Sequence, residues 1–303
     1  MHRTIAEFLA GQALASAVIG GGNRAAFALS RALAMITGED QRPPTELRGI
    51  YAWLAAHLAR LDDGAGAMRL IEADAVTVLA YGDAAVFATP ARRSILANLD
   101  RHDPYFRASE VGITAVGGLA DEDLASDFTA VLCGPSDGTH RLLTVLEALT
   151  HGPPVASIRQ LLRTIALDPA RPEVQRWRAA DASLNGVGDP TAARRLLLDD
   201  LADEPVSMGR EALRAHLMAE LPSQAISVAD IKSLIAGFLR TPEDHTIGRL
   251  WRLRRKLEAE PRPELFDEPM DAWRPQDMRY TPASEINDLL DHVWPRRSER
   301  PRI

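Results

Sequence analysis

Two short turns in this chain contain the residue types that acid–base or anion-binding chemistry requires. The first turn, YGDAAVFATP, follows an apolar run at 76–82 and contains Gly82 and Asp83. The second turn, GPSDGT, offers small polar groups in a row: Gly134, Ser136, Asp137 and Thr139. Glycine permits close approach of a ligand to the backbone, and a helix starting near Thr139 would direct N–H groups at a phosphate or carboxylate. Asp83 and Asp137 are the candidate acid–base groups.

Both turns also have a purely structural interpretation. Asp83, Ser136 and Asp137 belong to the residue types that cap helix N-termini. The GPSDGT turn lacks the glycine pattern of a dinucleotide fingerprint and the Gly-Lys-Ser/Thr signature of a P-loop. Ligand binding and helix capping therefore stand as two alternatives for each turn.

Other segments carry weaker chemical signals. IGGGNR at 19–24 is either an anion cradle or a link between two helices, and His102-Asp103 is either an acid–base pair or part of a solvated loop. Cys133, the only cysteine, lies in an apolar run and is expected to be a buried small hydrophobe. The chain shows no metal-ligand spacing and no serine nucleophile elbow. We therefore expect no metal and no cofactor, and we assign no catalytic residue.

The two turns need a scaffold, and the apolar runs around them predict a parallel sheet. Four short runs are rich in apolar and β-branched residues: 76–82, 111–118, 129–134 and 154–158. Helical patterns at 91–100 and 140–152 alternate with these runs, which is typical of a Rossmann-like α/β region, here 71–158, with about four strands. The loops at one edge of such a sheet lie together, so Gly82, Asp83 and the GPSDGT turn would share one rim.

Helices are expected on both sides of this region. Residues 1–70 predict a helical cap, with apolar stripes at 4–17, 23–37 and 47–61. Residues 159–260 predict an all-helical domain, with helices at 158–167, 172–183, 190–202, 207–220, 228–239 and 242–259. Ser227 and Asp230 have the spacing of a capping box at the start of one of these helices. Residues 261–303 form a Pro/Trp/Arg-rich C-terminal extension, with one more helix expected after Thr281.

Composition narrows the classes of function. The 303 residues are 46% apolar and 25% charged, which is ordinary for a globular protein. The net charge of −7 argues against nucleic acid as a partner, because phosphate binding requires clustered Lys and Arg. No apolar run reaches the length of a membrane span, and a single cysteine fits a reducing compartment, so we expect a cytoplasmic protein without membrane contact.

Several segments between about residues 15 and 158 resemble the sugar-phosphate isomerases related to translation initiation factor 2B. They are VIGGGNRAAFALSRALAMI, QRPPTELRGIYAWLAAHLARL, DAVTVLAYGDAAVFAT and DFTAVLCGPSDGTHRLLTVLEALTHGPPVASI. The chain departs from the family at two decisive positions: Gly82 stands where the family has its catalytic cysteine, and Ser136 where it has its catalytic aspartate. The resemblance implies loss of the isomerase chemistry and survival of a pocket for a phosphorylated small molecule.

Three functional hypotheses follow. The first is a non-catalytic or divergent α/β protein that binds a sugar phosphate or nucleotide at the sheet rim, with a helical half that binds a protein partner. The second is a structural or adaptor protein without a small-molecule ligand, which docks a partner through its helical half and C-terminal tail. Trp and Arg are favoured interface anchors, and the second hypothesis uses Trp251, Trp273 and Trp294 in that role. The third is an isomerase-like enzyme.

Overall fold

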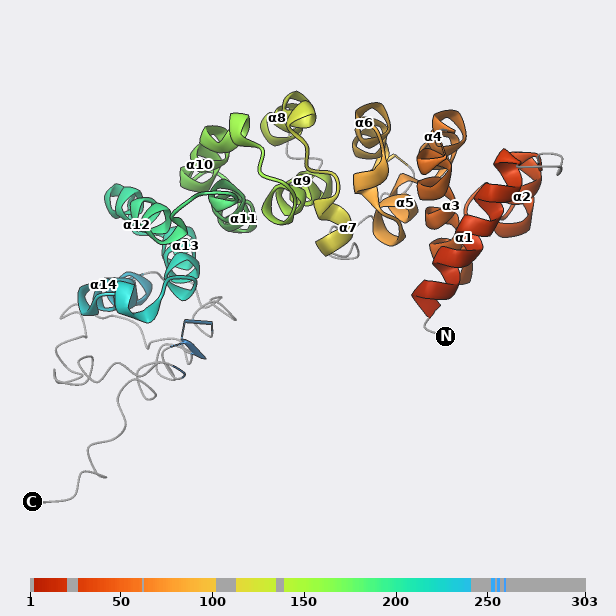
Figure 1. Cartoon of the computed structure of the whole chain (residues 1–303). Helices are drawn as coiled ribbons and strands as arrows, with labels where there is room; N and C mark the ends of the chain where they lie inside the picture. The colour runs from red at the N-terminus through yellow and green to blue at the C-terminus, as the bar shows by residue number, and fades with distance from the viewer. Residues whose placement is uncertain are drawn as a thin grey trace, which may run out of the picture. The chain divides into compact units, whose positions relative to one another are not determined.

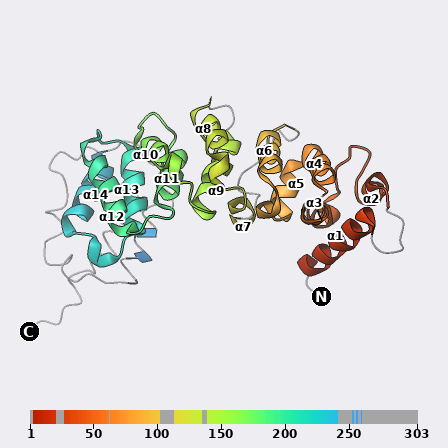
Figure 2. The same cartoon turned by 45° about the horizontal axis from the view of Figure 1, so that its top comes forward.

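The computed structural model of this chain describes residues 3–20, 27–61, 63–101, 113–134 and 139–240, together with residues 252, 253, 255, 256 and 259. In these ranges all regular secondary structure is helical, with fourteen α-helices, short 3₁₀ segments and no β-strand (Figures 1 and 2). The predicted α/β, Rossmann-like sheet is therefore wrong.

The described part of each run that was predicted as a strand contains helical residues and no strand. The run at 76–82 falls in α5 (Ala75–Tyr81), and the run at 129–134 falls in α8 (Ala125–Cys133). The described part of 111–118 contains α7 (Ile113–Gly117), and 154–158 contains the 3₁₀ segment η6 (Ala156–Ile158). A short run of consecutive apolar residues shows no periodicity, so its sequence cannot distinguish a strand from a buried helix.

At the first of these runs, residues 76–82, a side-chain cap starts a helix. The Asp74 carboxylate accepts a hydrogen bond from the backbone N–H of Thr77 at 2.9 Å and so starts α5. Gly82 follows the helix in an extended conformation, and its N–H donates to the carbonyl oxygen of Val78. A helix of seven residues thus has a polar cap at its start and a glycine at its end.

The chain divides into two compact units. The first consists of Met1–Leu162 and Asp181–Gly186, and the second of Arg163–Ala180 and Val187–Ile303. The remaining α-helices of the first unit are α1 (Arg3–Ile19), α2 (Leu29–Ile36), α3 (Arg48–Arg60), α4 (Gly64–Ala73), α6 (Thr89–Asn98) and α9 (Thr139–His151). Its remaining 3₁₀ segments are η1 (Thr45–Leu47), η2 (Ala84–Val86) and η4 (Glu122–Leu124).

The helices of the first unit form a stack of two layers. In one layer α1 packs along α3, α3 along α5, α5 along α7 and α7 along α9. Helices that connect these in sequence form a second layer, in which α4 packs along α6. Figure 1 shows α4, α6 and α8 on one side of α3, α5 and α9. Each helix therefore contacts mainly its neighbours in the stack, as in repeat proteins.

Glycine permits the closest approaches within this stack. A Cβ atom on Gly11 of α1 would lie 2.7 Å from the Cβ atom of Trp53 in α3. A Cβ atom on Gly152 would lie 2.2 Å from the carbonyl oxygen of Gly117, where the chain leaves α9 beside α7. Larger residues at these two positions would push the helices apart.

The second unit is built around α13 (Met208–Ala219), which packs against α12 (Pro190–Asp200) and α14 (Val228–Arg240). Two short segments, η7 (Leu201–Asp203) and η8 (Ser223–Ala225), lie between these helices. Two further helices, α10 (Arg159–Leu167) and α11 (Glu173–Leu184), cross the boundary between the units. Every residue of α13 from Arg210 to Met218 is buried, although several of them carry charge.

The helix predictions outside the supposed sheet are confirmed where residues are described. The ranges 4–17 and 47–61 correspond to α1 and α3, and the five ranges from 158 to 239 correspond to α10 to α14. The described part of 23–37 contains α2, and the patterns at 91–100 and 140–152 correspond to α6 and α9. Most of 242–259 and all residues after 260 lie outside the described part. None of the described helices is both long and apolar enough to cross a bilayer.

Candidate functional site

The first predicted turn is a structural corner. Gly82 ends α5 and lies against α3, because a Cβ atom there would be 3.3 Å from the carbonyl oxygen of Ala52. The Asp83 carboxylate caps η2 by accepting from the N–H of Ala85 at 3.2 Å, and it also accepts from Arg60 at 3.0 Å. The capping alternative is therefore confirmed for Asp83, and ligand binding at this turn stays a prediction.

The second predicted turn lies only partly in the described residues. Gly134 follows α8 in an extended conformation, and Thr139 is the first residue of α9. Ser136 and Asp137 lie outside the described residues. Cys133 is exposed at the end of α8, so its predicted burial is wrong. Since no strand exists in the described ranges, the predicted pocket for a phosphorylated ligand at a sheet rim is also wrong.

The structure does not describe the remaining candidates. Residues 21–26, the pair His102-Asp103, and the anchors Trp251, Trp273 and Trp294 lie outside the described residues. No three His, Cys, Asp or Glu side chains in the described part of the chain come together as a metal ion would require.

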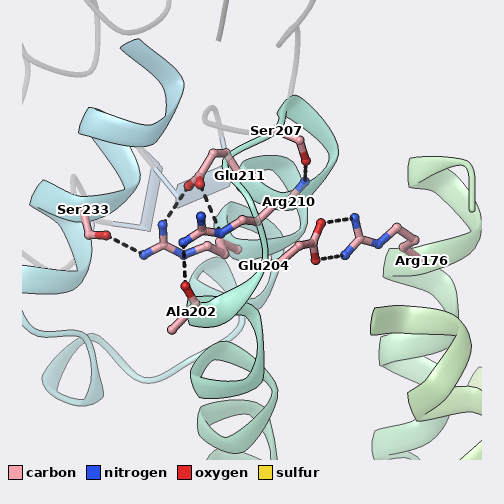
Figure 3. A network of polar contacts seen from close by, with 8 residues as sticks. Arg176, Ala202, Glu204, Ser207, Arg210, Glu211 and Ser233 are labelled. Carbon is pink, nitrogen blue, oxygen red and sulfur yellow. Dashed lines mark hydrogen bonds and ion pairs between the residues drawn. The ribbon is translucent and has the colours of Figure 1, made fainter. Parts of the chain in front are cut away.

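Among the described residues, the densest set of buried charges lies in the second unit, around α13. We call it the buried charge cluster, and Figure 3 shows it together with the neighbouring Ala202, Ser207 and Ser233. Its members are Arg176 of α11, Glu204 after η7, and Arg210, Glu211 and Arg214 of α13. Three guanidinium groups thus face two carboxylates, and each of the five side chains has an ionic partner within the cluster.

Arg176 and Glu204 form one half of the cluster. The guanidinium donates to both carboxylate oxygens of Glu204, at 3.0 and 2.6 Å, and its Nε donates to the carbonyl oxygen of Ala166 at 2.9 Å. The Arg176 residue is 1% exposed. This bidentate pair joins α11 to the last turns of α10 and to the segment that leads into α13.

Glu211 is the centre of the other half and is fully buried. One of its carboxylate oxygens accepts from Arg214 at 2.8 Å, and the other lies 3.5 Å from Nε of Arg210. Burial raises the pKa of Glu211 above its ordinary value, although Arg214 and Arg210 act in the opposite direction. Arg214 also donates to the hydroxyl of Ser233 at 3.1 Å and so connects α13 to α14.

Gly237 of α14 makes room for this carboxylate. A Cβ atom at that position would lie 2.3 Å from the carboxyl carbon of Glu211. Helix α14 therefore covers Glu211 with backbone, and a substrate has no route to the one acid whose pKa is raised in this cluster. The cluster is suited to fixing five segments of the chain in one arrangement, and it is not suited to acid–base catalysis.

The comparisons with known proteins assign no family to this chain. No family model, curated protein or solved structure matches this chain. Two of the segments on which the resemblance to the isomerases was based, at 76–82 and 129–134, are helical here.

The residues of the buried charge cluster are not among the predicted site residues, although the sequence contains one signal for their burial. In REALRAHLMA, apolar residues occupy most of the helix circumference, and Met218 lies on the same face as Arg210, Glu211 and Arg214, so the charged face also carries an apolar side chain. Such a helix is buried all round, and charged residues in a buried helix must be paired. Glu211 and Arg214, three residues apart, satisfy this condition within one turn.

Proposed function

We propose that this chain is a non-catalytic structural or adaptor protein, which binds another protein on the surface of its stacked helices. The two-layered stack of the first unit is the observation that carries the proposal. In such a stack, equivalent faces of successive helices lie side by side and form one extended surface, and proteins of this architecture use that surface for binding.

The polar groups of the predicted turns support the same proposal. Asp83 is engaged by Arg60 and by the N–H of Ala85, and Gly82 serves a helix crossing. Arg176 and Glu211 of the buried charge cluster are almost inaccessible to solvent. At these places the charged side chains hold helices together.

The exposed apolar residues indicate where a partner could be sought first. Ile5 and Leu9, one turn apart on α1, are 53% and 44% exposed, and Leu196 on α12 is 55% exposed. These side chains can be changed to aspartate without disturbing a core, so the pair on α1 and the single residue on α12 test the two units separately.

Affinity capture with the full chain, followed by reconstitution with the purified captured protein, tests the proposal. The wild type is compared with Ile5→Asp/Leu9→Asp and with Leu196→Asp, after circular dichroism has shown that each variant keeps its helix content. A partner that binds the wild type at micromolar concentration or below, and binds one variant at least about tenfold more weakly, supports an adaptor.

The opposite result is also clearly defined. Saturable thermal stabilisation by a sugar phosphate or a nucleotide, together with the absence of any protein whose binding depends on these surfaces, would overturn the proposal.

A further inference from the structure

Helix α1 is held to the stack almost entirely by α3. Of its seventeen residues only Gly11 and Ala15 are buried. The Phe8 ring contacts two rings of α3, with its centroid 4.9 Å from that of Trp53 and 4.7 Å from that of His57. One aromatic cluster, formed by Phe8, Trp53 and His57, therefore fastens the first helix of the stack.

His57 is unusual within this cluster because it can carry a charge. The residue is 5% exposed, and its Nε2 atom is buried without a hydrogen-bond partner among the described residues. Its ring packs against Phe8 of α1, with 4.7 Å between centroids, and lies 6.0 Å from the Trp53 ring of its own helix. A second proton on this imidazole would place a positive charge beside the Phe8 ring and an N–H without an acceptor at the buried Nε2.

The charged side chains around His57 do not favour protonation of its imidazole. Arg60 on α3 is the charged side chain that acts on His57, and it is positive. The other charged groups on α3 and on or beside the elements packed against it do not act on the pKa of His57: Arg3, Glu7, Glu46, Arg48, Asp63, Arg69, Glu72, Asp74 and Asp83. Glu7 binds Arg3 and covers Gly49, while Asp83 binds Arg60. The backbone carbonyl of Phe8 is the one group that favours the charged imidazole.

We infer that His57 is a proton-sensitive latch: the neutral imidazole keeps α1 docked on α3, and protonation of the imidazole releases α1 from the stack. Release would expose the inner face of α1, with Phe8, and the aromatic face of α3, with Trp53. The inference concerns how one end of the stack opens, and it does not depend on the proposed adaptor function.

The direction of the pH dependence follows from linkage. Burial, and after it Arg60, lowers the pKa of His57 in the docked state below its ordinary value. The docked state therefore binds protons less readily than the undocked state. Docking is at full strength above about pH 6.5, and it weakens as the pH falls from there towards the lowered pKa.

Hydrogen exchange of the full chain, read by mass spectrometry over residues 3–19, tests the latch. After correction for the intrinsic exchange rate, opening of α1 should increase as the pH falls from 6.5 towards the lowered pKa, by at most about tenfold for each pH unit. In His57→Phe, which keeps an aromatic ring but cannot titrate, this increase should vanish. The matched control is His151→Phe, which removes a partly exposed histidine that is paired with Glu147 at the end of α9.

Opening of α1 that is independent of pH, or that rises equally in His57→Phe, would overturn the inference. If His57→Phe leaves α1 undocked at every pH, titration of the wild-type imidazole by NMR decides. A pKa below the ordinary histidine value supports the latch, and a pKa at or above that value rejects it.

Discussion

The second unit contains both buried and exposed arginine–carboxylate pairs. Exposure to water decides how much stability is lost when one partner of a pair is removed. Arg176 and Glu204 are nearly inaccessible, with side chains 2% and 9% exposed. Arg163 and Asp200, which also form an ion pair, have side chains 30% and 38% exposed. A buried pair whose partner is removed leaves a charge without solvation, whereas an exposed partner is solvated by water.

Arg176→Met should therefore destabilise the second unit strongly. It leaves the Glu204 carboxylate buried without its bidentate donor and the Ala166 carbonyl without a partner. We expect a loss of about 3 to 5 kcal/mol in the free energy of unfolding, measured by urea denaturation and circular dichroism.

Arg163→Met is the matched control, since it makes the same change of side chain in the same unit. It should cost less than about 1 kcal/mol, because the Asp200 carboxylate is exposed to water. Equal losses in the two variants would show that burial of the Arg176–Glu204 pair does not matter.

The sequence predicts local polar pairings better than distant ones. The capping box of Ser227 and Asp230 is confirmed, with N–H of Asp230 donating to the Ser227 hydroxyl at 3.0 Å and N–H of Ser227 donating to the carboxylate at 2.8 Å. Both groups lie within one helical turn, so spacing alone identifies them. Arg176 and Glu204 are 28 residues apart, and no local pattern links them.

At the scale of elements, caps and glycines position the helices. Asp230 caps α14 and also accepts two hydrogen bonds from Arg195 of α12, at 2.8 and 3.0 Å. Burial alone would raise the pKa of Asp230, but the hydrogen bonds from Arg195 and Ser227 outweigh burial and lower it. One carboxylate thus starts α14 and joins it to α12.

Asp230→Asn should reduce the free energy of unfolding by about 1 to 2 kcal/mol at pH 7, because it removes the charge from these hydrogen bonds. Since the pKa is lowered in the folded state, the contribution is complete above the unfolded value of about 4 and is lost as the pH falls through the folded pKa. Urea titrations at pH 7, 5 and 3 should show the difference between wild type and variant shrinking only at the lowest pH. A difference that is the same at all three values would contradict this assignment.

The crossing of α7 and α9 depends on Gly152. In Gly152→Ala the new methyl group would meet the Gly117 carbonyl at 2.2 Å and the Cβ atom of Ala120 at 2.5 Å, and both are backbone or rigid atoms. We expect a loss of about 2 to 3 kcal/mol, seen as a lower urea midpoint. Gly64→Ala, at the start of α4 with no atom within 4 Å of the new methyl group, should instead be neutral or stabilise by up to about 1 kcal/mol. If both substitutions are tolerated, the helices do not need the close contact.

Elements with a clear stripe were predictable, and short buried ones were not. Helix α3 extends over thirteen residues, and the pattern of 47–61 predicts it. Helix α5 has only seven residues, four of which are buried, and its valine and threonine content is typical of strands. The surrounding helices of the stack bury α5 on several sides, and this tertiary context is invisible in a short segment.

At the scale of the whole molecule, the described helices make mostly local contacts, and stability should vary along the first unit accordingly. Helix α3 buries eight of its residues between α1, α4 and α5, whereas α1 buries two and packs mainly against α3. In a stack of this kind, a helix with few buried residues can open without unfolding its neighbours.

Native-state hydrogen exchange at pH 7.5, where His57 is neutral, should therefore reveal a gradient. Amides of α1 should exchange at least about tenfold faster than those of α3, after correction for intrinsic rates, because α1 can open alone while α3 opens only with its neighbours. Gly152→Ala should raise exchange most in α7 and α9, less in α5, and least in α3. If α1 and α3 were equally protected, or if Gly152→Ala raised exchange uniformly, the first unit would unfold as one cooperative block and the stack would not be a series of locally coupled helices.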